Sequence, residues 1–167
     1  MRSSLTLAVT LLATLSFSSS AISDSTVVVD QAKQNGIVTC VEPLDNVANF
    51  IIGDRRHGSH STWNNNNANE RIFTSMTAKH YSDGDGHVTI VAAPVGDGKC
   101  DTTYIETYAL ERTCISARES LYSDWTFTGE LVGTIVLENE AGTVNLYLTS
   151  QGSGNICLVS RRETVYN

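Results

Sequence analysis

Two histidines with basic and aromatic neighbours form one group of side chains that could do chemistry. Two residues separate His57 from His60, Arg55 and Arg56 precede them, and Trp63 follows. A metal site needs three or four protein ligands in fixed geometry. Two histidines supply half a site at most, so we interpret them as surface residues. A metal-dependent hydrolase that uses His57 and His60 is the alternative interpretation.

No other pattern points to catalysis. The sequence has no Gly-x-Ser-x-Gly motif, in which a serine nucleophile sits on a turn between a strand and a helix. The small residues around Ser153 fall between two expected antiparallel strands, and no glycine-rich phosphate cradle is present. We therefore expect a non-catalytic protein that needs no cofactor.

The histidines lie within the longest polar stretch, residues 53–70, which contains glycines and a run of four asparagines. A loop of this length inside a compact domain is uncommon, and such loops are either functional or disordered. Arginine and tryptophan are over-represented in binding hot spots. We therefore expect Arg55, Arg56 and Trp63 to form one anchor for a partner protein.

The first 23 residues read as a secretory signal peptide. A short, weakly positive start precedes the apolar run 5–17, and small residues suited to cleavage follow. The rest, residues 24–167, suits one exported domain without a membrane span. The net charge of −7 argues against binding to nucleic acid, which requires a clustered basic face.

Four cysteines, Cys40, Cys100, Cys114 and Cys157, predict two disulfides in an exported chain. A ten-residue strand spans about 33 Å, whereas bonded cysteines have Cα atoms within about 7 Å of each other. An extended strand over 101–110 therefore rules out a Cys100–Cys114 bond. If helices and strands alternate in direction, both helix starts lie at one end of the sheet and both third-strand starts at the other. This predicts the pairs Cys40–Cys114 and Cys100–Cys157.

Hydrophobic periodicity predicts two helices and six strands. The helices are expected over 42–52 and just after Cys114. The strands are expected over 71–81, 87–95, 101–110, 126–138, 143–150 and 155–166. We expect an α+β fold in which two helices cover one face of an antiparallel sheet of about six strands. A helix followed by three strands occurs twice, which suggests an internal repeat of the form αβββ-αβββ.

The uncovered face of such a sheet is a second candidate binding surface. If Ile105 and Ala109 face the helices, the two-residue period of a strand places Tyr104 and Tyr108 on the other face. Tyr147 points the same way if its neighbours Leu146 and Leu148 face the core. Tyrosine is enriched at protein interfaces, although it is also simply a good strand residue.

These patterns predict a small exported protein that binds another exported or envelope protein. An inhibitor, an immunity protein and an envelope assembly factor all fit the size, the disulfides and the lack of a catalytic motif. The candidate binding residues are Arg55, Arg56, His57, His60, Trp63, Tyr104, Tyr108 and Tyr147.

Overall fold

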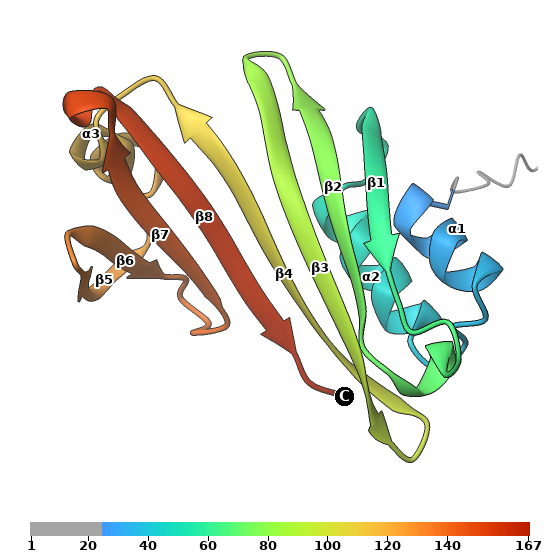
Figure 1. Ribbon diagram of the computed structural model, residues 1–167. Helices are drawn as coiled ribbons and strands as arrows, with labels where there is room; N and C mark the ends of the chain where they lie inside the picture. Colours follow the sequence, from blue (N-terminus) through green and yellow to red (C-terminus); the bar gives the residue numbers. More distant parts are fainter. Residues whose placement is uncertain (1–24) are drawn as a thin grey trace, which may run out of the picture.

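The computed structural model describes residues 25–167, so the expected signal peptide, residues 1–23, lies outside the described residues. One eight-stranded antiparallel sheet, in the order β1-β2-β3-β4-β8-β7-β6-β5, forms the body of the molecule (Figure 1). The helices are α1 (Val27–Gln34), α2 (Val41–Ile51) and α3 (Cys114–Leu121), with short 3-10 turns at Ala68–Glu70 and Gly152–Gly154. The strands are β1 (His57–Thr62), β2 (Phe73–Tyr81), β3 (Gly84–Gly96), β4 (Lys99–Leu110), β5 (Thr126–Leu131), β6 (Thr134–Glu138), β7 (Val144–Gln151) and β8 (Ile156–Val165).

The α+β class is confirmed, but the number of strands is eight rather than six. One extra strand, β1, lies inside the stretch 53–70, where we expected a loop. The other arises because the expected strand 126–138 is a hairpin of β5 and β6. The residues of β1 are polar or small, because an edge strand needs few buried apolar side chains. Hydrophobic periodicity therefore does not detect it.

The helices number three rather than two. The expected helices correspond to α2 and α3, whereas α1 was missed. Its run of three valines favours a strand in isolation. In the folded chain Val28, Val29 and Ala32 lie on one side of a short helix and are buried against the sheet, so tertiary packing overrides local preference.

All three helices pack on one face of the sheet, which we call the helix face; the other is the open face. Strand residues with alternating burial point to the two faces in turn. Val88 and Ile90 on β3 and Leu146 on β7 are buried on the helix face. They belong to two separate apolar cores, an N-terminal core under α1 and α2 and a C-terminal core under α3.

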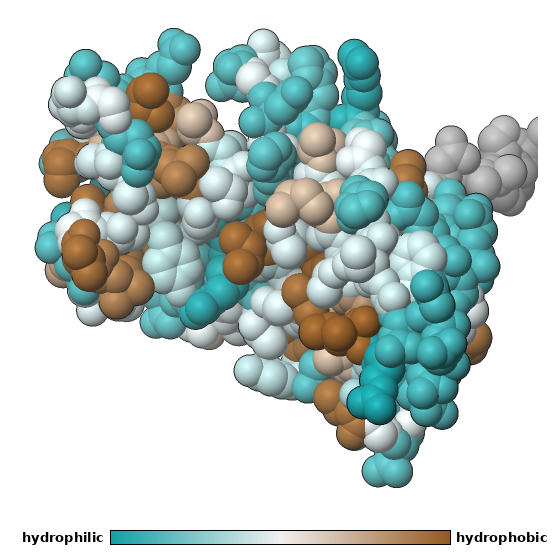
Figure 2. Space-filling view, in the orientation of Figure 1, coloured by the Kyte–Doolittle hydropathy of each residue, from teal (hydrophilic) through white to brown (hydrophobic). Residues whose placement is uncertain are grey.

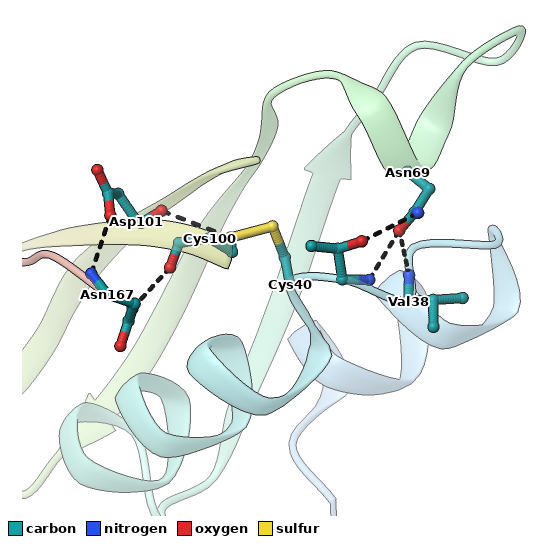
Figure 3. Close-up of a disulfide and its surroundings, with 7 residues drawn as sticks. Val38, Cys40, Asn69, Cys100, Asp101 and Asn167 are labelled. Atoms are coloured by element: carbon teal, nitrogen blue, oxygen red, sulfur yellow. Dashed lines mark hydrogen bonds between the residues drawn. A yellow bond between two sulfur atoms is a disulfide. The ribbon is translucent and has the colours of Figure 1, made fainter. Parts of the chain in front are cut away.

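The disulfides join Cys40 to Cys100 and Cys114 to Cys157, so the predicted pairing is wrong. Their Cα atoms are 5.3 Å and 4.8 Å apart. Each bond ties the start of a helix to the start of a strand within the same half of the chain. Figure 3 shows the first of them, between the start of α2 and the start of β4 (Figure 3). The prediction failed because β4 and β8 run antiparallel. Their starts, and with them Cys100 and Cys157, therefore lie at opposite ends of the sheet.

This reversal reveals the repeat in its real form, which contains four strands per unit rather than three. The order α2-β1-β2-β3-β4 is followed by α3-β5-β6-β7-β8, and each unit has its own helix-to-last-strand disulfide. The units meet where β4 pairs with β8 antiparallel. Ile105 pairs with Arg162 there. Ile105 follows Cys100 by the same number of residues as Arg162 follows Cys157. An approximate twofold axis therefore crosses the sheet at this pair.

Among the described helices, none combines the length and the apolar character needed to cross a membrane.

Candidate functional site

The residues of the expected 53–70 anchor are separated by β1. Arg55 and Arg56 precede the strand and Trp63 follows it, which puts about 20 Å of extended chain between them. The guanidinium of Arg55 lies 4.9 Å from the centre of the Tyr81 ring. Trp63 packs against the N-terminal core at the other end of β1. The three side chains therefore do not form one anchor.

His57 and His60 point to opposite faces of β1. His57 pairs with Lys79, whose side chain is buried on the helix face, while His60 pairs with the exposed Met76 on the open face. The ring of His57 is within hydrogen-bond distance of the Arg55 carbonyl, 2.6 Å, and accepts from the Val27 amide at 3.3 Å. Within residues 25–167, no three His, Cys, Asp or Glu side chains are grouped to hold a metal ion. This geometry gives the two histidines no shared ligand position.

Tyr104 and Tyr108 lie on the helix face, so their predicted orientation is wrong. Tyr104 is 1% exposed, whereas Ile105 is 40% exposed on the open face. Burial on this face is tolerated because the hydroxyl groups have partners: Tyr104 donates to Glu163 at 2.9 Å. The hydroxyls of Tyr108 and Tyr122 are 2.7 Å apart.

Tyr147 lies on the open face, as predicted, because its neighbours Leu146 and Leu148 are buried. The guanidinium of Arg162 lies 5.3 Å from the centre of its ring. The open face around it consists largely of threonine and serine, whose hydroxyls bond to each other across strands at Thr107–Ser160 and Thr134–Thr149. It is not the tyrosine surface that we expected.

Polar and aromatic side chains fill the helix face between the two apolar cores. We call this group the central seam; it consists of Lys79, Tyr81, Glu106, Tyr108 and Tyr122, together with Tyr104 at the border of the N-terminal core. Lys79 is 5% exposed and forms an ion pair with the equally buried Glu106, with 2.6 Å between Nζ and Oε1. The same ammonium group donates to the Ile51 carbonyl at the end of α2, and the Tyr81 hydroxyl donates to the same carboxylate oxygen.

Burial raises the pKa of every tyrosine in the central seam above the ordinary value of 10.0. A phenolate in this seam would lose its hydration, and desolvation disfavours the charged form. The hydrogen bond from Tyr81 to Glu106 adds to the rise of the Tyr81 pKa, because ionisation would place two negative charges side by side. The surroundings of the seam therefore favour the neutral form of these phenols. The seam also joins the two halves of the chain, because Tyr108 contacts Tyr122.

The β5–β6 hairpin presents an unusual exposed tip. Leu131 pairs with Thr134, so Val132 and Gly133 form the two-residue turn. Both have positive φ, 50° for Val132 and 81° for Gly133, as a type I′ turn requires. Val132 is fully exposed, at 107% of its reference area, and Leu131 is 60% exposed. Figure 2 shows hydrophobic surface at the left of the open face, over this hairpin (Figure 2).

The two edges of the sheet differ in how far they are covered. At the β1 edge, Gln31 on α1 donates to the Ser59 carbonyl at 3.0 Å and accepts from the Ser61 hydroxyl at 2.6 Å. At the β5 edge, no described residue hydrogen-bonds to the outward backbone groups of 126–131. A bulge between Phe127 and Gly129 interrupts the pairing with β6. The β5 edge is therefore the open one.

Sequence reasoning missed the hairpin tip, although a signal for it was present. Gly129 and Gly133 both lie within the expected strand 126–138, and glycine inside a strand often marks a bulge or a bend. Gly129 is at the bulge, whereas Gly133 belongs to the turn. The pair Val132-Gly133 is hard to recognise as a type I′ turn, because Asn, Asp or Gly normally precedes the glycine.

Comparisons with known protein families, with curated proteins and with solved structures found no match to this chain.

Proposed function

We propose that this chain is an exported binding protein that captures an extended, basic segment of another polypeptide at the β5–β6 hairpin. The observation that carries the proposal is the conformation of Val132. A β-branched residue in the left-handed region is a steric outlier. Backbone strain of this kind costs about 1–3 kcal/mol and clusters at functional sites.

Asparagine at position 132 would form the preferred Asn-Gly turn at lower cost. An exposed valine there contributes no burial within the molecule to offset the strain. Contact with a partner offers such an offset, because burying a valine side chain stabilises by about 1.5–3 kcal/mol. Leu131 on the same hairpin is also exposed, at 60%, and would extend the contact.

The free edge of β5 suggests how the partner binds. In a two-residue hairpin the closing pair exchanges hydrogen bonds. The backbone groups of Glu130, next to Leu131, therefore point away from β6. An extended segment can pair with such an edge by strand addition, in which main-chain hydrogen bonds supply affinity and side-chain contacts supply specificity.

The charge of the hairpin specifies the partner further. Residues 123–143 contain four acidic side chains and no lysine, arginine or histidine. Complementary charge steers association and rejects wrong partners. The captured segment should therefore alternate apolar residues with lysine or arginine.

An exported location is supported by the two disulfides, which persist in oxidising surroundings, and by the predicted signal peptide. We propose that the partner is exported to the same place. An inhibitor, an immunity protein and an envelope assembly factor each work by a contact of this kind, and the identity of the captured segment decides among them.

A displayed library of random peptides, selected on the disulfide-intact protein, tests the proposal. The selected peptides should alternate apolar and basic residues. Val132→Asn should weaken their binding about tenfold, because the burial of the valine side chain, about 1.5 kcal/mol or more, is lost. The same change should raise the free energy of unfolding by about 1 kcal/mol, since the strain is relieved. Loss of folding therefore cannot explain loss of binding.

Three control variants separate the contributions. Glu130→Gln removes the charge alone, and Glu130→Pro also removes the outward N–H. Proline should weaken binding more than glutamine if the backbone pairs with the peptide. Val95→Asn, at an exposed valine near the β3–β4 turn, should leave binding unchanged. Peptides without basic residues, or equal binding by native protein and Val132→Asn, would refute the proposal.

A further inference from the structure

A cleft lies at the end of β1, beside Trp63. Its volume is about 750 Å³, within the range of about 300–1,000 Å³ that is typical of ligand sites. The connection from β1 to β2 forms one wall, and Ala93 and Pro94 at the end of β3 form the other. This cleft contains Trp63 and most of the asparagine run, which the proposed function does not use.

The walls of the cleft are held in place before any ligand binds. The side-chain oxygen of Asn64 accepts from the amides of Asn66 and Asn67, at 2.9 Å and 3.0 Å. Asn69 accepts from the amides of Val38 and Thr39, at 2.7 Å and 2.8 Å (Figure 3). Trp63 is anchored against the N-terminal core. A preformed site loses little conformational freedom on binding.

Several polar side chains of the lining are free to bond a ligand. Among the described residues, no hydrogen bond or ion pair involves the side chains of Asn66, Asn67, Glu70 or Arg71. Amide, carboxylate and guanidinium groups are planar and offer two neighbouring donors or acceptors each. They suit a ligand with hydroxyl groups on adjacent atoms.

The cleft has no net formal charge, because Glu70 and Arg71 are the only charged residues that line it. The molecule as a whole carries −7, so neutrality here sets the cleft apart from the acidic hairpin. It favours a neutral ligand over a charged one. Trp63 and the exposed Ile72 add apolar surface to the same lining.

We infer that this cleft binds a neutral carbohydrate chain. The ring of Trp63 offers a flat surface for the C–H face of a sugar. Asn67, Glu70 and Arg71 offer paired hydrogen bonds to its hydroxyls. The site is independent of the proposed peptide contact, because β1 and β5 are opposite edges of the sheet.

The fluorescence of Trp63 provides a direct test, because the chain has only two tryptophans. The second, Trp125, packs against the C-terminal core; Trp125→Phe makes Trp63 the only reporter. The full disulfide-bonded chain is titrated with maltotetraose, cellotetraose and chitotetraose. At least one should change the Trp63 emission saturably, with a Kd of about 1 mM or tighter. Calorimetry on the native chain should give the same constant.

A matched pair of asparagine variants locates the site. Asn67 lines the cleft, whereas Asn65 belongs to the same run and does not. Asn67→Ala should weaken sugar binding about tenfold, and Asn65→Ala should leave it unchanged. No saturable response to any of the three sugars, or equal effects of the two variants, would overturn the inference. Binding of a charged heparin fragment in preference to all three neutral sugars would also overturn it. None of these outcomes changes peptide binding at the hairpin.

Discussion

At the scale of single residues, the ion pair of Lys79 and Glu106 is the main exception to an apolar interior. A buried charge pair contributes little net stability, but removing one partner leaves the other charge without compensation. Lys79 and Glu106 come from β2 and β4 and are 27 residues apart. Lysine and glutamate in strands with alternating burial are normally solvent-exposed, so the sequence alone does not identify this pair.

Replacement of Lys79 by methionine should lower the free energy of unfolding by about 3–5 kcal/mol, because Glu106 would remain buried and unpaired. The double change Lys79→Met with Glu106→Leu should recover most of this loss, since both charges are then absent. Urea denaturation of native protein, both single variants and the double variant gives the coupling energy. Additive losses would mean that the two groups do not act as a pair.

At the scale of elements, each disulfide supports its own half of the sheet. The bonds close loops with sequence separations of 60 and 43 residues. The chain-entropy model assigns about 4 kcal/mol to each closure. Their placement within a half, rather than between halves, follows from the end-for-end reversal of the two repeats.

The variant Cys114→Ala with Cys157→Ala should lose about 4 kcal/mol of stability. Hydrogen exchange should accelerate first in α3 and β5–β7, while β1–β3 stay protected. The matched variant Cys40→Ala with Cys100→Ala should show the opposite pattern, with early exchange in α2 and β1. Had the predicted pairing Cys40–Cys114 been correct, either change would loosen both halves together, and non-reducing peptide mapping would recover that linkage.

At the scale of the whole molecule, the central seam joins the two halves. Tyr81 and Tyr108 have ring centres 6.2 Å apart, and Tyr108 contacts Tyr122 beyond α3. A tyrosine with a raised pKa keeps its proton in the folded chain at pH values where the unfolded chain loses it. The resulting stabilisation is complete below the ordinary pKa of 10.0 and is lost progressively as the pH rises further.

Stability should therefore fall steeply above about pH 10, while this contribution stays constant below about pH 9. The phenolate absorbance of the seam tyrosines should appear together with the loss of tertiary circular dichroism. Tyr108→Phe should make the alkaline decline shallower, after correction for any change in stability at neutral pH. Phenolate formation by the seam tyrosines in a chain that is still folded would contradict this prediction.

The sequence by itself determined the local features of this protein. Periodicity located α2, α3 and most strands, because amphipathic patterns such as Phe73–Tyr81 report burial directly. The strands expected over 71–81 and 87–95 correspond to β2 and β3, which are joined by a tight turn at Ser82 and Asp83. Extended geometry correctly excluded a Cys100–Cys114 bond.

Only the tertiary structure decided which strands are neighbours and which face each strand residue takes. Alternation divides the side chains of β4 between the two faces of the sheet but does not say which face the helices cover. The prediction therefore placed Ile105 on the helix face and Tyr104 on the open face, the reverse of the structure. The orientation of the second repeat decided the disulfides, because cysteines pair by proximity and not by order in the chain. The polar strand β1 exists because pairing with β2, which lies further along the chain, outweighs the local preference of residues 57–62. That pairing energy is absent from any short stretch of sequence.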